Sequence, residues 1–203
     1  MLGLLAYIIG SFPTGVMIGK VFFQKDIRDY GSGNTGTTNT YRVLGFIPGT
    51  VVLVIDILKG TLAGLLPVLF YQNTHFFVLL FGVIAVIGHC FPIFLKFKGG
   101  KAVATSAGIS LAYDWHFFVL SAIIFTIILW LTSTVSLTSI ISFPLFTLEA
   151  LLFHDWLLAT IAALITVFVI YRHKANIQRL LNGTEEPLHF GLRYKINAKK
   201  SHK

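Results

Sequence analysis

Long apolar stretches separated by short polar turns dominate this chain of 203 residues. A helix rises about 1.5 Å per residue and the hydrocarbon core of a bilayer is about 30 Å thick, so most of the stretches can cross a membrane. The stretch 102–113 reaches only about 18 Å; it is either a half-length helix buried by its neighbours or one that extends into Lys101. The pattern predicts an all-α integral membrane protein with about seven transmembrane segments, some of them short. They cover residues 2–23, 46–71, 76–94, 102–113, 115–131, 135–152 and 156–171.

The first two apolar stretches carry polar or helix-breaking interruptions. Pro13, between Gly10 and Gly15, interrupts the first stretch, which marks a kink or close packing of helices. The second stretch contains Asp56 and Lys59, which lie three residues apart on one helix and are expected to pair within the membrane. We interpret this pair first as a packing device and second as support for an adjacent anion site.

The composition agrees with a membrane protein. Charged residues make up 12% of the chain, about half the share of a soluble domain, and 55% of the residues are hydrophobic. The one cysteine, Cys90, excludes an internal disulfide. Because no internal repeat or linker stands out, we expect a single membrane domain, residues 1–203. It would comprise a transmembrane bundle at 1–171, a cytoplasmic interfacial amphipathic helix at 172–186 and a basic tail at 187–203.

The positive charges alternate along the chain. Apart from Lys59, every Lys and Arg lies in residues 20–42, in residues 96–101 or after residue 171, and the intervening turns contain none. With seven segments, this bias places the N-terminus outside and the C-terminus in the cytoplasm. The net charge of +8 is accordingly attributed to basic cytoplasmic loops and not to nucleic-acid binding. The same orientation brings every glycine- and base-rich stretch to the cytoplasmic face.

Residues 31–42 are the stretch richest in glycine and small polar residues. The glycines permit left-handed or tightly turned backbone, so several N–H groups can point into one concavity. Asn39 or Thr38 could cap a following helix, whose positive end would add to that field. With Arg42 as a bidentate partner, such a cradle suits a phosphate. The alternative is an ordinary glycine-rich turn between two membrane helices.

A second glycine- and base-rich stretch covers residues 88–101. It holds a Gly-Gly pair flanked by Lys98 and Lys101, where backbone N–H and ammonium groups could converge on a phosphate, although the spacing is not that of a Walker A motif. The alternative is a positive-inside anchor with a flexible turn. His89 lies near the membrane end of the preceding segment, where an ionisable group is a functional-site candidate by default.

The third polar stretch, residues 172–186, predicts an amphipathic helix that lies in the membrane interface and ends near Gly183. His173 and Asn176 are three residues apart and could act together. The alternative is a structural surface helix that binds anionic lipid. The Ser and Thr residues of 136–142 could line a polar substrate pocket or hydrogen-bond to their own helix backbone.

Together the three stretches resemble the signature motifs of the bacterial membrane acyl-phosphate:glycerol-3-phosphate acyltransferases, the PlsY family. The resemblance spans essentially the whole chain, with small departures at Thr37, where the family often has Ala, and at Ala102, where it often has Gly. Ala102 restricts the backbone after the Lys101 turn. The matching residues are Gly31-Ser32-Gly33-Asn34, Asn39 and Arg42; Gly88-His89, Phe91-Pro92 and Lys98-Gly99-Gly100-Lys101; and Arg172-His173, Asn176-Ile177, Arg179-Leu180, Gly183 and Glu185.

The resemblance implies transfer of a fatty acyl group from acyl-phosphate to the 1-hydroxyl of glycerol 3-phosphate. The products would be lysophosphatidic acid and inorganic phosphate, at the first step of phospholipid synthesis. It further implies a direct one-step attack at a single site on the cytoplasmic face of the bacterial inner membrane, with neither acyl-CoA nor acyl carrier protein as donor. The partners would be the two substrates and membrane lipid, and we expect a monomer that needs no cofactor and no metal.

Residue roles follow from the same resemblance. The second motif would hold the phosphate of glycerol 3-phosphate, and Ser32 and Arg42 would act on acyl-phosphate. We infer that Asn34, Asn39 and nearby amides stabilise the tetrahedral oxyanion as charge develops. Catalytic roles are expected for Ser32, Asn34, Asn39, Arg42, His89, His173 and Asn176. Substrate-binding roles are expected for Gly31, Gly33, Lys59, Lys98, Gly99, Gly100, Lys101, Thr105, Ser139, Ser142, Arg179 and Glu185.

Two questions of mechanism and class stay open at this point. The general base is His89, His173 or a phosphate oxygen of the acyl-phosphate itself. Ser32 is favoured as a hydrogen-bonding residue over a covalent nucleophile, because no histidine adjacent in sequence would activate it. A transporter would place its polar sites near the bilayer midplane, and a lipid-binding or assembly protein would not need three polar motifs, so the pattern favours an enzyme over both.

Overall fold

All regular elements in the described part of the chain are helices. The computed structural model describes residues 1–70, 75–188 and 190–201. By its internal contacts the chain divides into two compact units, Met1–Trp115 and His116–Lys203, and each unit is treated by itself. The expected division into a bundle, an interfacial helix and a tail within one domain stays a prediction.

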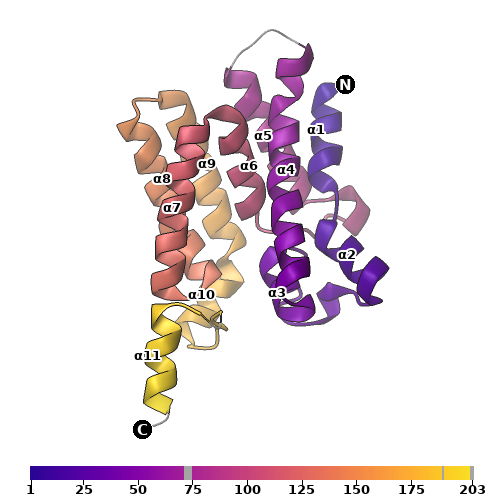
Figure 1. Ribbon diagram of the computed structural model, residues 1–203. Helices are drawn as coiled ribbons and strands as arrows, with labels where there is room; N and C mark the ends of the chain where they lie inside the picture. Colours follow the sequence, from indigo (N-terminus) through magenta and orange to yellow (C-terminus); the bar gives the residue numbers. More distant parts are fainter. Residues whose placement is uncertain (71–74, 189, 202–203) are drawn as a thin grey trace. The chain divides into compact units, whose positions relative to one another are not determined.

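The first unit begins with a broken helix pair. The axes of its first two helices differ by 46° at Pro13, because proline lacks an N–H and clashes with the preceding turn. This confirms the expected interruption of the first apolar stretch. The helices of the unit, shown in Figure 1, are α1 (Leu2–Ser11), α2 (Thr14–Phe23), η1 (Ile27–Asp29), α3 (Thr37–Leu44), α4 (Phe46–Phe70), α5 (His75–Cys90), η2 (Ile93–Leu95) and α6 (Val103–Tyr113).

Close backbone contacts hold α6 against α4. A Cβ atom on Gly60 would overlap the carbonyl oxygen of Thr105, and one on Gly108 would overlap the backbone of α4. The hydroxyl of Thr61 donates a hydrogen bond to the carbonyl of Gly108 at 3.0 Å. Small residues at such crossings let membrane helices approach closely. α6 is therefore a half-length helix packed on its neighbour and does not extend into Lys101, which is the first of the two expected alternatives.

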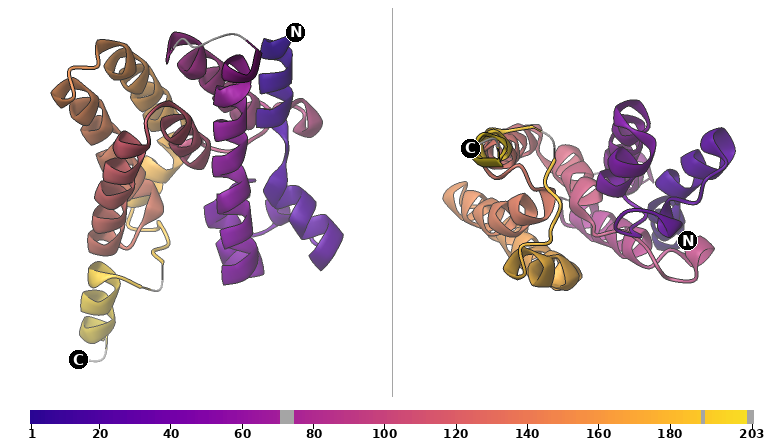
Figure 2. Two further views of the ribbon diagram at one scale, coloured as in Figure 1. Left: turned by 45° about the horizontal axis from the view of Figure 1, so that its top comes forward. Right: turned by 90° about the horizontal axis from the view of Figure 1, so that it is seen from below.

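The same kind of contact joins α1 to α5. A Cβ atom on Gly10 would overlap the backbone of Ala85, and one on Gly88 would overlap the carbonyl oxygen of Tyr7. A cluster of buried side chains from α1, α4 and α5 lies beside these contacts: Ala6, Ala63, Leu66 and Ala85. These helices lie side by side in Figures 1 and 2. The end of α5 that carries His89 is thereby fixed against α1.

In the second unit, the three long helices α7, α8 and α9 are followed by the two shorter helices α10 and α11. α8 contains Pro144 and is joined to α9 beside it, because the hydroxyl of Thr166 donates to the carbonyl of Phe143 at 3.0 Å. The helices are α7 (Trp115–Thr132), α8 (Val135–Leu152), α9 (Trp156–Arg172), α10 (Lys174–Leu181) and α11 (Leu192–Ser201).

The C-terminal region differs from the expectation in two ways. The segment 172–186 is helical over fewer residues than its assigned bounds: α10 ends at Leu181, just before Gly183, which was predicted to end the helix and has a left-handed conformation (φ +69°), and the backbone turns back on Arg179. The basic tail also contains a helix that was not predicted, α11. The segment leading to α11 is fixed by Ser133, whose carbonyl accepts from the N–H of Leu188 at 2.7 Å.

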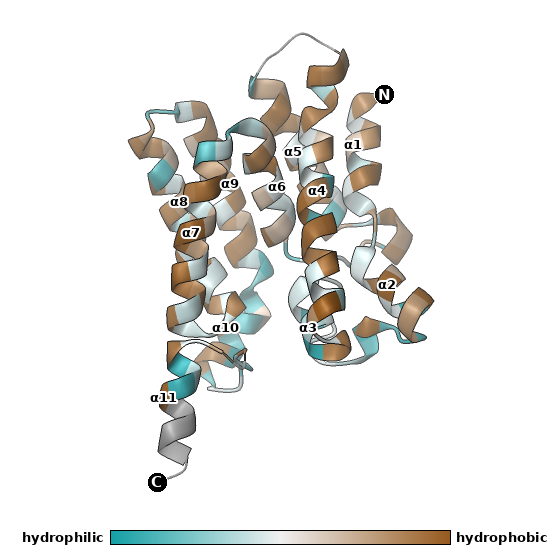
Figure 3. Ribbon diagram, in the orientation of Figure 1, coloured by the Kyte–Doolittle hydropathy of each residue, from teal (hydrophilic) through white to brown (hydrophobic). Residues whose placement is uncertain are grey.

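Four helices of the described residues are long and apolar enough to cross a membrane, and up to six spans result if each bent pair, α1–α2 and α9–α10, counts as one. Figure 3 shows hydrophobic residues along α4, α5 and α7, with hydrophilic residues in the turns and around α10. The 11 residues of α6 are apolar but shorter than these spans. The expected count of seven, which depends on α6, and the expected orientation of the termini stay predictions.

Candidate active site

The loop of residues 24–36 wraps around the start of α3. Gly31 and Gly33 have φ angles of +58° and +67°, as expected for glycines that turn the chain sharply. A Cβ atom on Gly31 would approach Oδ1 of Asn39 to 2.5 Å, so the loop can lie this close to the helix only with glycine at that position. The glycines thus shape the loop that presents Ser32.

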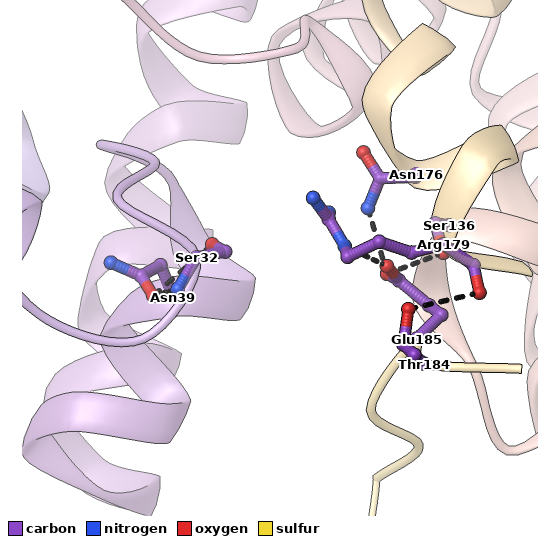
Figure 4. Close-up of polar contacts among 7 residues, drawn as sticks. All are labelled: Ser32, Asn39, Ser136, Asn176, Arg179, Thr184 and Glu185. Atoms are coloured by element: carbon purple, nitrogen blue, oxygen red, sulfur yellow. Dashed lines mark hydrogen bonds and ion pairs between the residues drawn. The ribbon is translucent and has the colours of Figure 1, made fainter. Parts of the chain in front are cut away.

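Asn39 is the hydrogen-bonding centre of this loop. Its Nδ2 group donates to the carbonyls of Ile27, Tyr30 and Asn34 at 2.7, 3.2 and 2.9 Å. Its Oδ1 atom accepts from the backbone N–H of Ser32 at 2.8 Å and from the Ser32 hydroxyl at 3.2 Å (Figure 4). With its side chain 1% exposed and both ends of the amide engaged, Asn39 suits a positioning role better than the oxyanion-donor role expected from the sequence.

The N-terminus of α3 lies directly after the loop. The expectation that Asn39 or Thr38 caps this helix is wrong, because both lie inside it and Gly36 occupies the N-cap without a side-chain cap. The first N–H groups of α3 therefore lack acceptors within the helix and leave a partial positive charge there. Asn34 accepts from the N–H of Gly36 at 3.0 Å through Oδ1, and its Nδ2 group has no acceptor among the described residues. Arg42 follows on the same helix.

A charged clamp secures the loop on the side of α2. Arg28 donates to both carboxylate oxygens of Asp26, at 2.9 and 2.6 Å, and Lys20 lies 3.2 Å from the same carboxylate. The hydrogen bonds from Arg28 hold the pKa of Asp26 far below its ordinary value, against the opposing effect of burial. Sequence reasoning missed Asp26; its signal was an acidic residue two positions before an arginine in a turn, which is a common capping pattern.

The second motif is built around the end of α5. The N–H groups of Gly99 and Gly100 donate to the carbonyls of Cys90 and His89, each at 3.1 Å. A Cβ atom on Gly100 would overlap the ring of His89. The two glycines therefore cap α5 and give His89 room. Because the N–H groups of Gly99 and Gly100 already donate to these carbonyls, they are not directed at a phosphate, as the sequence had suggested.

Two lysines precede α6 in the chain, and a buried hydroxyl lies in its first turn. Lys98 is exposed and Lys101 is partly exposed, directly before the helix. Ala102 is its N-cap residue, with φ +72° and no side-chain cap, so the first N–H groups of α6 lack acceptors within the helix. Thr105 is fully buried, and its hydroxyl has no partner among the described residues. Lys59, also predicted to bind substrate, lies buried in an ion pair with Asp56 at 2.8 Å, which confirms the expected pairing.

Glu185 is the hydrogen-bonding centre of the third motif (Figure 4). Ser136 of α8 and Asn176 of α10 donate to its Oε1 atom at 2.8 and 2.7 Å, and Arg179 donates to Oε2 at 2.6 Å. Burial raises the pKa of this carboxyl, but the three donors outweigh burial and leave it below its ordinary value. With a side chain only 3% exposed, Glu185 orients Asn176 and Arg179. Its third partner, Ser136, is one of the residues of 136–142 that the sequence indicated for a polar pocket or a bond to its own helix, and it donates to Glu185 instead.

The remaining predicted residues of the second unit are buried. His173 is 3% exposed, and its Nδ1 atom lies 2.8 Å from the carbonyl of Val169. Ser139 donates to the carbonyl of Val135 in its own helix, the more ordinary of the two expected outcomes. Ser142 is fully buried with a hydroxyl that has no partner among the described residues. A buried hydroxyl without a partner is costly unless a ligand or water satisfies it.

Residues 1–183 match the family model described as glycerol-3-phosphate acyltransferase. The chain belongs to the glycerol-3-phosphate acyltransferase family. Family members from Latilactobacillus sakei and Enterococcus faecalis, each named glycerol-3-phosphate acyltransferase, are both 57% identical to this chain. The first alignment covers 97% of this chain and 96% of the relative, and the second covers 98% and 95%.

A solved structure of the family supports the fold. The crystal structure of PlsY (YgiH), an integral membrane glycerol 3-phosphate acyltransferase in its glycerol 3-phosphate form, is 35% identical to this chain and superimposes with a TM-score of 0.83. The match covers 92% of this chain and 94% of that one. This family member is therefore an all-helical integral membrane acyltransferase, as the resemblance implied.

Proposed function

We propose that this chain transfers a fatty acyl group from acyl-phosphate to the 1-hydroxyl of glycerol 3-phosphate. The hydroxyl oxygen attacks the acyl carbon, the bond from that carbon to the phosphate oxygen breaks, and inorganic phosphate leaves. The hydroxyl proton passes to a base, and lysophosphatidic acid is the second product. Glycerol 3-phosphate as acceptor is supported by the names of the relatives, and acyl-phosphate as donor is inferred from the motifs.

The observation that carries the proposal is a pair of helix N-termini in the first unit. α3 and α6 both begin without a side-chain cap. α3 contains Arg42, and Lys98 and Lys101 precede α6 in the chain. Uncapped helix N-termini favour phosphate groups. Two such anion sites match a reaction in which both substrates are phosphorylated, and the long apolar helices offer the acyl chain a lipid environment.

The first motif is assigned to the acyl-phosphate. The phosphate group of the acyl-phosphate would lie at the start of α3, bound by Arg42 and by the hydroxyl of Ser32. Ser32 lies on the loop that Gly31 and Gly33 shape. The Nδ2 group of Asn34 is the donor we assign to the oxyanion that develops on the acyl oxygen. Because phosphate is already a good leaving group, positioning and charge stabilisation would supply most of the catalysis.

The second motif is assigned to the phosphate of glycerol 3-phosphate. Lys98, Lys101 and the first N–H groups of α6 would bind it, with Thr105 as a further donor. Gly99 and Gly100 contribute by shaping the turn and not through their own N–H groups. In the second unit, Asn176, Arg179, Ser139 and Ser142 are proposed as further substrate contacts, which Glu185 supports by orienting the first two.

The proton acceptor is one of three groups. Histidine is a common general base, so His89 and His173 are two candidates, and the third is an oxygen of the acyl-phosphate, which would lie beside the attacking hydroxyl. The hydrogen bond from Ser32 to Asn39 favours a hydrogen-bonding role for Ser32 and a direct, one-step attack. If replacing each histidine by alanine leaves kcat unchanged and only raises KM, the base belongs to the substrate.

We place the site on the cytoplasmic face of the bacterial inner membrane, in a monomeric multi-pass protein. Within the first unit, the N-terminus of α1 and the α2–α3 loop lie at opposite ends (Figure 1). The basic residues of that loop therefore gather at one end, which the positive-inside rule assigns to the cytoplasm.

The donor is tested with purified protein in lipid nanodiscs. Palmitoyl-phosphate and palmitoyl-CoA are each supplied with glycerol 3-phosphate, and the lipid product is identified by mass. We expect lysophosphatidic acid from palmitoyl-phosphate alone. Product from palmitoyl-CoA alone would keep the acyl transfer but overturn the donor, and no product from either would overturn the proposed function.

A further inference from the structure

The buried ion pair of α4 faces the break in the first membrane span. Lys59 and Asp56 are joined by a contact of 2.8 Å and their side chains are only 6% and 3% exposed. Lys59 also donates to the carbonyl of Phe12 at 3.2 Å. Asp56 accepts from the hydroxyl of Thr14 at 3.0 Å through the same oxygen that meets Lys59. The pair thus contacts the chain on both sides of Pro13.

The two charges are arranged by sign. Phe12 is the C-cap of α1, and the C-terminal end of a helix carries a partial negative charge. Thr14 is the first residue of α2, where the partial charge is positive. The ammonium of Lys59 therefore faces the negative end of α1, and the carboxylate of Asp56 faces the positive end of α2.

The break connects the first two motifs. α1 packs on α5, whose last turn carries His89, through the close contacts at Gly10 and Gly88. α2 packs on the first-motif loop, because a Cβ atom on Gly15 would overlap the carbonyl of Thr35. The bend between α1 and α2 therefore sets how the first-motif loop lies relative to His89.

A small pocket of mixed polar and apolar lining lies at this junction. It is lined by residues of the first motif loop, the break, the ion pair and the second motif, including Thr35, Ser11, Lys59 and His89. Ser11 is fully buried and its hydroxyl has no partner among the described residues. A change in the ion pair therefore reaches groups of both motifs at once.

We propose that Asp56 and Lys59 are positioning residues that hold the bend between α1 and α2, and so align the first-motif loop with His89. Lys59 acts through the carbonyl of Phe12 and not by binding substrate, which revises the role expected from the sequence. The effect of the ion pair on catalysis rests on the proposed function. Its effect on the bend between α1 and α2 does not. What matters is the direction of the pair and not only the presence of two opposite charges.

A charge swap tests this direction. The double variant D56K/K59D keeps an ion pair but turns each charge toward the helix end of like sign, and D56N/K59Q keeps polar side chains without charge. Thermal stability is measured for both in detergent, and kcat/KM is measured on the monodisperse folded fraction well below each Tm. We expect kcat/KM to fall about tenfold for the neutral pair and about a hundredfold for the swap, with Tm in the same order.

The outcomes separate this proposal from the proposed function. If the charge-swapped variant is as stable and as active as the neutral variant, the positioning proposal is overturned, because the orientation of the charges toward the helix ends then has no effect. If the wild-type protein makes no lysophosphatidic acid, the proposed function fails, and the order of Tm values still decides the direction of the pair.

A milder pair of variants covers the case in which neither double variant folds. Thr14→Val removes the hydrogen bond to Asp56 at nearly constant shape, and Thr14→Ser retains it. We expect kcat/KM of the folded valine variant to fall about tenfold and the serine variant to recover it. Wild-type kcat/KM in Thr14→Val would contradict the positioning role.

Discussion

The side-chain oxygen of Asn39 accepts hydrogen bonds from both the backbone N–H and the hydroxyl of Ser32, at 2.8 and 3.2 Å. The other end of the same amide is engaged by backbone carbonyls of the loop. One buried side chain thus fixes the orientation of the serine that we assign to acyl-phosphate. The position of Ser32 therefore depends on the side chain of Asn39 as well as on the conformation of the loop.

Asn39→Asp tests this relationship with almost no change of shape. Aspartate can still accept from Ser32, but it cannot donate to the carbonyls of Ile27, Tyr30 and Asn34 and would place a negative charge against them. We expect a loss of roughly 2–4 kcal/mol in the free energy of unfolding and at least about a hundredfold loss of kcat. Chemical denaturation and steady-state kinetics measure the two effects.

The matched control is Asn182→Asp, at an exposed residue that has no assigned role in the site. It should change stability by less than about 1 kcal/mol and leave kcat unaltered. Equal behaviour of the two variants would contradict the central place of Asn39 in the loop.

Gly100→Ala should impair the reaction by displacing His89, since the added methyl group overlaps the imidazole ring. We expect about a tenfold or greater loss of kcat/KM for glycerol 3-phosphate, because His89 and the adjoining turn both move. Gly3→Ala is the control: its Cβ atom meets only the side chain of Ile84, at 3.6 Å, an ordinary contact. Kinetics of Gly100→Ala that match those of the control would show that the glycine is not needed for space.

Ala102→Gly should stabilise the protein slightly. Ala102 has φ +72°, a left-handed conformation that costs about 1 kcal/mol for alanine, and the greater freedom of glycine in the unfolded chain offsets part of the gain. We expect a net gain of about 0.5 kcal/mol, measured as a higher Tm. Ala104→Gly, inside α6, should instead lose about 1 kcal/mol, and a loss at both positions would argue against strain at residue 102.

Glu185 gives the protein a predictable response to acid. Its pKa lies below the ordinary value of 4.5, so its contribution to stability is fully present above about that pH and is lost as the pH falls through the folded-state pKa. The destabilisation caused by Glu185→Gln should therefore be largest at neutral pH and should shrink below about pH 4.5. Thermal unfolding across the pH range measures it, and a constant difference down to pH 3 would contradict the assignment.

Much of the fold could be predicted from the apolar pattern, because membrane spans are long and nearly free of charge. The bounds of α8 were predicted without error, and the break at Pro13 was evident from the loss of a backbone donor. α11 was missed because its sequence is dominated by basic residues and lacks an apolar face of ordinary strength. For α10, the assigned bounds ran to residue 186, but Gly183 was predicted to end the helix, and its left-handed backbone follows the last helical residue, Leu181, by two positions.

The sequence indicated which residues to examine as a candidate site, but it could not indicate their structural roles. The sequence singled out Asn39, Glu185 and Gly99, yet it could not indicate that the first two orient their neighbours and the third caps α5. Such roles depend on which carbonyls and donors tertiary packing brings within reach. The ion pair of Asp56 and Lys59 was predictable from its spacing alone, whereas its alignment with the helix ends at Pro13 required the structure.

The most direct test of the account measures inorganic phosphate and lysophosphatidic acid in one reaction, with purified protein, palmitoyl-phosphate and glycerol 3-phosphate. We predict one phosphate released for each lysophosphatidic acid formed, from the first turnover onward, and neither product when either substrate is omitted. A burst of phosphate without glycerol 3-phosphate, with palmitate retained on the protein, would contradict the one-step attack. The absence of lysophosphatidic acid, with folded protein and both substrates present, would contradict acyl-phosphate as the donor.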